Sequence, residues 1–598
     1  MTETINQRWD LDSLFSGSSD SAAFESFIHS LETDLTSFHT LLDRRRQPFQ
    51  ASDTGLFEET IHTYEDLTRR LTEAIAFTEC LTAQDVTDEK ASALSSRLQA
   101  LSAKLEVVDS LLSNSLRDIA DSDWQTLVQR MHEISFNLQE KRDLAKKLLA
   151  AQDEQLISQL SVDGYHAWGN LYYALVGKLS IPVVNGDGEK QQLSISQANN
   201  LLEDSDRAVR KQTFEALEKV WSEQADLFAS VLNHISGFRL ATYEARGWSD
   251  FLSEPLDYNR LSRQTLDQMW RMVASYKPRF QAFLKRKAEL LGVKKLAWYD
   301  VDAPLFSSSP KISYEEAGNF VVRHFRGFNP QMADFAAKAL SKRWIEAENR
   351  PGKRPGGFCT SFPLARQSRI FMTFSGTMGN TSTLAHELGH AYHQSVMNDL
   401  PYLSQHYAMN VAETASTFSE LIVSDAAEEA AQTKEEKITY LSNKLERSIA
   451  LLMNIHARFL FETRFYKERQ KGVVSVARLN ELMLEAQQEA YLDSLDTYHP
   501  LFWASKLHFY ITDWPFYNFP YTFGFLFSTG IYVQARKEGP SYSSKYDALL
   551  RDTGRMTTEQ LAARHLGVDL TTEDFWHSAL DYCAADVDQF LKLTDDML

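Results

Sequence analysis

The chain has 598 residues, which is long enough for two or more lobes that each bury a core. Its formal net charge of −19 opposes a phosphate backbone, so we expect no nucleic-acid partner. The three cysteines are far apart and show no CxxC spacing, which argues against a disulfide framework and a thiolate metal cluster. With no basic and apolar leader and no apolar run of about 20 residues, the sequence predicts a cytoplasmic protein without a membrane span.

The first part of the chain has helical periodicity. From Leu94 to Leu116 leucine and valine recur at alternating steps of four and three residues, which predicts a long packed helix. Residues 56–82 and 123–152 have similar periodicity with almost no Gly or Pro. These patterns predict a helical hairpin or bundle.

A β-hairpin is predicted after this bundle. Two strand-like segments, 179–184 and 191–195, flank the turn residues 185–188. We therefore place an N-terminal helical lobe at residues 1–200, ending in the hairpin, and a second domain at residues 201–598.

The second domain is also predicted to be mainly α. Helical patterns cover residues 204–290, 314–347 and 434–470. Residues 350–357 have loop composition, and residues 368–374 have the β-branched and aromatic content of a strand. The expected fold class is mainly α with a small β-sheet.

The motif HELGH at residues 386–390 follows that strand. On a helix, His386 and His390 lie one turn apart on one face, so both imidazoles can reach one ion while Glu387 holds a water. The residues Thr381, Ser382 and Thr383 are candidate N-caps, which would place the motif in the first turns of its helix. The pattern predicts a zincin-like zinc site.

A catalytic zinc needs a third protein ligand. His393 would lie about 10.5 Å along the helix from His386, too far for a shared ion, so we expect it in the core or behind the ligands. Position 396 is valine, which excludes the three-histidine metzincin pattern. Asp399 precedes a turn that is too short to bring it back to the metal.

Glu413 is the best candidate for the third ligand. It follows a connection long enough to reverse direction and begins a helical run with small flanking residues. Glu420 lies two turns further on the same face and could orient a ligating imidazole.

The motif HELGH, separated by 22 residues from Glu413 in VAETAS, resembles peptidase family M3, and within it the bacterial oligoendopeptidase F branch. The resemblance extends through four further segments: residues 356–362 (GGFCTSF), 368–376 (SRIFMTFSG), 508–510 (HFY) and 516–524 (FYNFPYTFG). It covers most of residues 200–598.

This resemblance implies a two-lobed helical body with a deep substrate channel that admits only short, unfolded peptides. It implies that the strand at 368–374 is the sheet edge that pairs with the substrate backbone. It also implies that His508 and a tyrosine bind the scissile carbonyl oxygen and the oxyanion formed from it. Tyr521 is the preferred candidate for this tyrosine, and Tyr517 is the second.

We therefore predict a zinc metalloendopeptidase that cleaves internal bonds of short peptides. One zinc per chain is bound by His386, His390 and Glu413, and Glu387 is the general base for the metal-activated water. The alternatives are a zinc carboxypeptidase and a non-catalytic peptide-binding protein with a vestigial metal site. Cys359, near the predicted active-site wall, is expected to be a packed residue rather than a reactive thiol. The sequence leaves the oligomeric state open.

Overall fold

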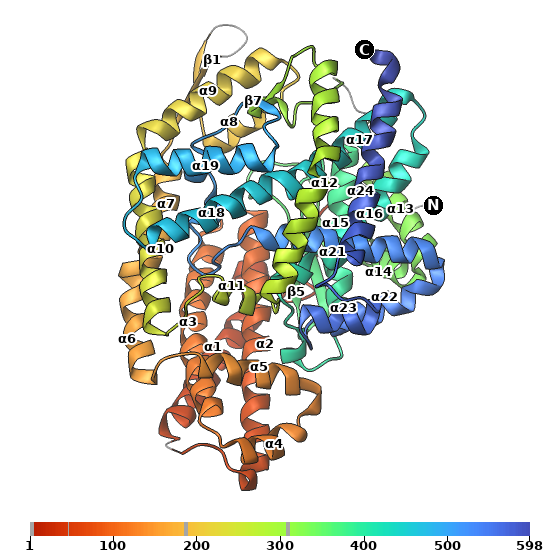
Figure 1. Cartoon of the computed structure of the whole chain (residues 1–598). Helices are drawn as coiled ribbons and strands as arrows, with labels where there is room; N and C mark the ends of the chain where they lie inside the picture. Colours follow the sequence, from red (N-terminus) through yellow and green to blue (C-terminus); the bar gives the residue numbers. More distant parts are fainter. Residues whose placement is uncertain (1–4, 46, 185–188, 307–310) are drawn as a thin grey trace.

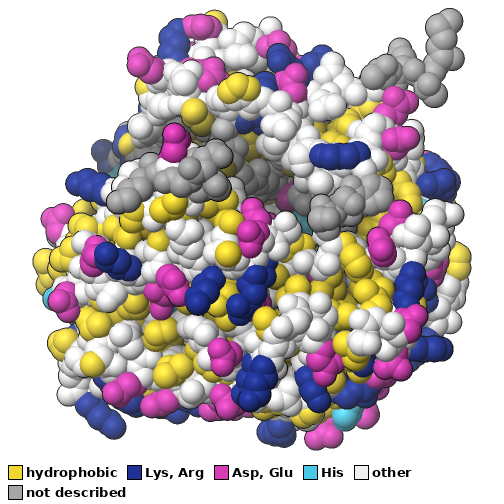
Figure 2. All heavy atoms as spheres, turned by 90° about the horizontal axis from the view of Figure 1, so that it is seen from above, with side chains coloured by type: hydrophobic (Ala, Val, Ile, Leu, Met, Phe, Trp, Pro, Cys, Tyr) yellow, Lys and Arg dark blue, Asp and Glu magenta, His cyan; other side chains and the backbone are white. Residues whose placement is uncertain are grey.

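The computed structural model describes residues 5–45, 47–184, 189–306 and 311–598. These are mainly helical, as the sequence predicts, with three small sheets, of which the sequence predicted the hairpin and one other (Figure 1). Within these ranges no helix combines the length and apolarity that a membrane crossing requires. On the face shown in Figure 2, basic and acidic side chains are interspersed among apolar ones.

The N-terminal helices form the lower part of the molecule in Figure 1, in red and orange. They are α1 (Ala22–Arg44), α2 (Thr54–Gln84), α3 (Glu89–Arg117), α4 (Asp121–Gln129) and α5 (Ser135–Lys146). The leucine seam of α3 is confirmed, because Leu98, Leu101, Leu112 and Leu116 are fully buried. The predicted helix over 123–152 is instead divided among α4, α5 and the first residues of α6.

The chain then crosses to a second, larger core. Its next elements are α6 (Ala151–Ser161), α7 (Ala167–Val176), β1 (Ile181–Val184), β2 (Lys190–Leu193) and α8 (Ile195–Leu201). β1 and β2 pair antiparallel with Ile181 opposite Leu193, which confirms the hairpin. Its predicted turn, residues 185–188, lies outside the described residues.

The hairpin packs Ile181 and Val183 into the larger core. The smaller core is formed by residues from Trp9 to Leu138 together with two residues of a sheet, Phe362 and Phe371. The division of the chain at residue 200 stays a prediction.

The remaining helices build the larger core. They are α9 (Arg207–Glu223), α10 (Ala225–Ala245), α11 (Ser253–Tyr258), α12 (Arg263–Leu290), α13 (Tyr314–Phe328), α14 (Pro330–Ser341), α15 (Met378–Met397), α16 (Met409–Ala430), α17 (Lys434–Ile449), α18 (Ile455–Arg469), α19 (Val476–Ala490), α20 (Phe502–Ser505), α21 (Phe519–Glu538), α22 (Ser543–Asp552), α23 (Thr558–Leu566) and α24 (Asp574–Leu593). The predicted helix over 434–470 is confirmed as α17 and α18, joined by a π-helical turn at Ala450–Asn454.

Two further sheets lie in this part of the chain. One is the parallel pair β3 (Leu296–Ala297) and β7 (Leu495–Thr497). The other contains β4 (Ile345–Glu346), β5 (Phe358–Phe362) and β6 (Gln367–Phe371), in the order β4-β6-β5.

The prediction that residues 368–374 form a sheet edge is wrong. β6 is the central strand, parallel to β4 on one side and antiparallel to β5 on the other, so both of its edges are occupied. β5 is an edge strand of this sheet. The prediction failed because the partner β4 is only two residues long and follows a helical pattern, so no local signal marks it.

The pleat of β6 divides its side chains between the two cores. Ile370 and the following Met372 belong to the larger core, whereas Phe371 belongs to the smaller one. The alternating side chains therefore place this sheet between the two cores. In sequence, β6 directly precedes the helix that carries HELGH.

Candidate metal centre

Helix α15 begins earlier than the sequence predicted. Thr377 is its N-cap: its hydroxyl accepts from the Asn380 amide at 3.1 Å, and the Asn380 side chain reaches back to the Thr377 amide. Thr381 and Thr383 instead donate to carbonyls one turn back, as interior helical residues do. The N-cap prediction at 381–383 is therefore wrong, and HELGH lies in the middle of the helix.

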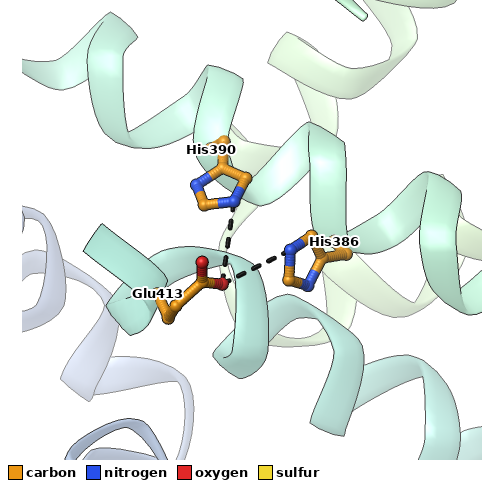
Figure 3. A group of neighbouring side chains, drawn as sticks. All are labelled: His386, His390 and Glu413. Carbon is orange, nitrogen blue, oxygen red and sulfur yellow. Dashed lines mark ion pairs between the residues drawn. The ribbon is translucent and has the colours of Figure 1, made fainter. Parts of the chain in front are cut away.

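His386, His390 and Glu413 converge on one point (Figure 3). Glu413 Oε2 lies 3.4 Å from His386 Nε2 and 3.7 Å from His390 Nε2. Two atoms that bind one zinc ion tetrahedrally at about 2.1 Å lie about 3.4 Å apart. The three side chains therefore fit a single zinc-sized ion with little rearrangement.

The approach of α16 to α15 depends on Gly389. A β-carbon at this position would lie 2.5 Å from the Ala415 carbonyl oxygen and 2.7 Å from Ser416 Cα. Such a contact is impossible without moving backbone, so only glycine allows this packing. Ser416 then donates to Glu413 Oε2 at 2.7 Å, which fixes the carboxylate toward the histidines.

Glu420 lies behind His386, as the sequence suggested. Its Oε2 is 3.2 Å from His386 Nδ1, and its other oxygen accepts from Arg447 of α17. A carboxylate at Nδ1 fixes the tautomer that leaves Nε2 free for a metal. Arg447 was not identified from the sequence, because its place in this chain of contacts depends on how α17 packs on α16.

The protonation states of the three candidate ligands suit a metal. Burial lowers the pKa of His390 to about 4 and also lowers the pKa of His386, so both imidazoles are neutral near pH 7. Burial alone would raise the pKa of Glu413, but His390, His386 and the Ser416 hydroxyl together lower it. Neutral imidazoles and a carboxylate are the forms that bind zinc.

Glu387 is buried beside this cluster, with 7% of its surface exposed. Burial raises the pKa of Glu387 to about 7, which suits a group that accepts and returns a proton near neutral pH. A cavity of about 570 Å³ lies against His386 and Glu387 and is also lined by Glu420, Tyr440 and Arg447. Gly357, next to the edge strand β5, also lies close to Glu387, because a β-carbon built on it would be 3.8 Å from Glu387 Oε1.

The two rejected ligands lie elsewhere. His393 is fully buried, with its Nε2 2.8 Å from Thr553 Oγ1 and its ring stacked on Tyr407. Asp399 binds Arg551 through both carboxylate oxygens. Both predictions are confirmed.

Cys359 lies on β5 opposite Ile370. Burial, and then the nearby Glu387 carboxylate, raise the pKa of its thiol well above the usual value. Cys359 is therefore a neutral thiol and not a thiolate near pH 7. This agrees with the expectation that it is a packed residue rather than a reactive one.

The three aromatic candidates form a cluster of their own. The ring centroids of His508, Tyr517 and Tyr521 lie 5.6 to 5.9 Å from one another. His508 is in a short 3-10 turn, and the two tyrosines flank the start of α21. Burial and the Tyr517 hydroxyl raise the pKa of Tyr521, so its hydroxyl remains a hydrogen-bond donor at neutral pH.

Helix α21 links this aromatic cluster to the metal ligands. A β-carbon at Gly524 would lie 3.1 Å from both Glu413 Cβ and the Asn410 carbonyl oxygen, so α21 packs closely on α16. Tyr521 is one turn before Gly524, and the Glu413 carboxylate contributes to its raised pKa. Of the three aromatic candidates, Tyr521 is therefore the one whose pKa responds to the Glu413 carboxylate.

Comparison with known proteins agrees with this geometry. The model of "Peptidase family M3" matches residues 200–582, and that of "Oligopeptidase F" matches residues 116–180. The chain belongs to peptidase family M3. Membership in family M3, with two histidines of an HExxH helix and a glutamate of the next helix in one cluster, makes this chain a metallopeptidase.

Several relatives align over most of the chain. Group B oligopeptidase PepB of Streptococcus agalactiae is 24% identical over 86% of each chain. Oligopeptidase PepF of Bacillus subtilis is 22% identical over 80% of this chain and 71% of the relative. The crystal structure of oligoendopeptidase-F from Enterococcus faecium superposes with a TM-score of 0.71 at 19% identity, covering 97% of this chain and 100% of that one. The last similarity shows a shared fold.

Proposed function

We propose that this chain is a zinc oligoendopeptidase that hydrolyses internal bonds of short peptides. The observation that carries the proposal is the spacing of 3.4 Å and 3.7 Å between Glu413 and the two histidines, which matches one tetrahedral zinc ion. His386, His390 and Glu413 would hold the ion. When bound, zinc supplies a Lewis acid that polarises the scissile carbonyl and lowers the pKa of a coordinated water.

Glu387 is the proposed general base and acid. Its carboxylate takes the proton of the attacking water and delivers it to the amine that leaves. Its raised pKa, about 7, supports both transfers, because the group can exist in either form near neutral pH. His508 and Tyr521, with Tyr517 as the second tyrosine, would donate hydrogen bonds to the oxyanion.

The substrate backbone is proposed to pair with β5. This strand has one edge free of strand pairing in the described part of the sheet, and it begins beside Glu387. Pairing through the main chain would accept many sequences, because the backbone groups are common to all peptides. Short peptide substrates are also consistent with the names of the relatives, which are oligopeptidases.

Two substitutions test the proposal with different readouts. Glu387→Gln keeps the size of the side chain and should retain one equivalent of zinc while losing at least 1000-fold in turnover of a short quenched peptide. Glu413→Ala should lose the metal itself, measured by metal content after gel filtration. Turnover at the wild-type rate in Glu387→Gln would refute the assignment of Glu387 as the general base.

A further inference from the structure

Two cations, Arg458 of α18 and Lys506, lie beside the aromatic cluster. Both approach the ring of Phe502: the Arg458 Cζ is 5.3 Å and the Lys506 Nζ 4.9 Å from its centroid. Both side chains keep part of their surface exposed. Both charges are therefore largely withdrawn from water but still within reach of solvent.

Neither cation has a carboxylate partner within 4.0 Å in the described part of the chain. Arg458 donates only to neutral amides, to Asn454 Oδ1 at 2.8 Å and to Asn518 Oδ1 at 3.3 Å. Enclosed cations are normally paired, because removing a charge from water is costly. Two neighbouring cations without a bound carboxylate are therefore expected to bind an anion from outside the chain.

A carboxylate, Asp302, lies near Lys506, but it forms no ion pair with Lys506 or Arg458 in the described part of the chain. Burial, and then Arg458, lower the pKa of Lys506 to about 8, although the Asp302 carboxylate acts in the opposite direction. Burial likewise lowers the pKa of Arg458 to about 10. His508 is also affected: burial, Arg458 and Lys506 lower its pKa to about 3, so it stays neutral beside them.

The position of this pair relates it to the reaction centre. Asn518, which accepts from Arg458, lies between Tyr517 and Tyr521 in sequence and is the N-cap of α21. The pKa of Tyr521 is raised by the Glu413 carboxylate and lowered by the Arg458 guanidinium, so both charges act on this tyrosine. In addition, His508 Nδ1 is buried without a hydrogen-bond partner among the described residues.

We propose that Arg458 and Lys506 form a subsite that binds a carboxylate of the peptide substrate, at a fixed distance from the bond that is cleaved. The inference rests on the proposed function and specifies its substrate class. The carboxylate belongs either to the C-terminus of a short peptide or to an acidic side chain. A charge-assisted contact of this kind favours the acid over the neutral analogue by about tenfold to a hundredfold.

The test compares matched peptides on the purified, zinc-loaded enzyme. The first arm measures kcat/KM for one peptide with a free C-terminal carboxylate and for the same peptide as a C-terminal amide. The second arm compares glutamate with glutamine at successive positions around the cleaved bond. We expect a preference of at least tenfold for the acid in one arm, and the arm that shows it identifies the source of the carboxylate.

Substitutions then assign the preference to the two cations. Arg458→Gln and Lys506→Met should each reduce the acid-to-neutral ratio toward one, whereas Lys506→Arg, which keeps the charge, should retain it. Lys471→Met, at an exposed lysine, is the matched control and should leave the ratio and the basal activity unchanged. If Arg458→Gln does not fold, Lys506→Met carries the test alone.

The outcomes separate this inference from the proposed function. Equal rates for acid and neutral peptides in both arms of the wild-type enzyme would overturn the subsite while leaving an active peptidase. A preference that survives both neutralising substitutions would also overturn it. No cleavage of any peptide by the zinc-loaded enzyme would instead refute the proposed function.

Discussion

Gly389→Ala is the substitution for which the structure gives the most direct magnitude. The added β-carbon would meet the Ala415 carbonyl oxygen at 2.5 Å and Ser416 Cα at 2.7 Å. Non-bonded carbon atoms prefer about 3.5 Å, so the contacts must lengthen by about 1 Å. Because two of the atoms belong to backbone, the change must come from the separation of α15 and α16.

That separation acts on the metal ligands, since His386 is on α15 and Glu413 is on α16. Their present spacing of 3.4 Å would grow past the value that one zinc ion can span. We expect zinc affinity to fall by about tenfold to a hundredfold, as for other losses of ligand orientation. Overpacking should also destabilise the folded chain by about 1–3 kcal/mol.

The assay is competition for zinc against a chromophoric chelator, with thermal melting recorded on the same samples. Gly55→Ala is the matched control: it is also helical, in α2, and its β-carbon would meet nothing within 4 Å. That control should keep its zinc affinity and gain up to about 1 kcal/mol in stability. A Gly389→Ala protein with wild-type affinity and melting temperature would refute the packing argument.

Two further predictions follow from carboxylates, one half-buried and one buried. Glu420→Gln removes the charge from the group at His386 Nδ1 and should weaken zinc binding about tenfold to a hundredfold, measured by the same competition; unchanged affinity would contradict the orienting role. Asp552 is buried against Arg555 and His565; burial opposes its ionised form, but these partners lower its pKa to about 2. A lowered carboxyl pKa stabilises the fold above the unfolded value of about 4 and loses that contribution as the pH falls toward 2. Asp552→Asn should therefore cost about 2 kcal/mol equally at pH 7 and pH 5, and less below pH 4, in urea unfolding; a larger cost at low pH would contradict the sign.

The candidate metal ligands were accessible from sequence because local rules specify them. Two histidines four residues apart in a helical pattern must share a face, and Glu413 follows a connection of a length that permits reversal. Ser416 could also have been found, because a hydroxyl three residues after a carboxylate lies on the same helical face. The resemblance to family M3 added the aromatic cluster, which no periodicity would have indicated.

The features that the sequence missed depend on contacts between distant segments. The central position of β6 requires β4, which is too short to have a pattern. Arg447 and Arg458 lie in a helical run whose π turn rotates one relative to the other, so regular periodicity would misplace at least one of them. The start of α15 was misjudged because three consecutive hydroxyl residues matched the cap pattern better than Thr377 alone.

The position of the three-stranded sheet gives the two lobes a mechanical connection. β6 contributes Phe371 to the smaller core and Ile370 to the larger one, and β5 contributes Phe362 to the smaller core while passing close to Glu387. A rotation of the N-terminal helices would therefore pull on β5, whereas α15 and α16 would keep the metal ligands together. Such a rotation would then shift a peptide paired with β5 relative to His386, His390 and Glu413.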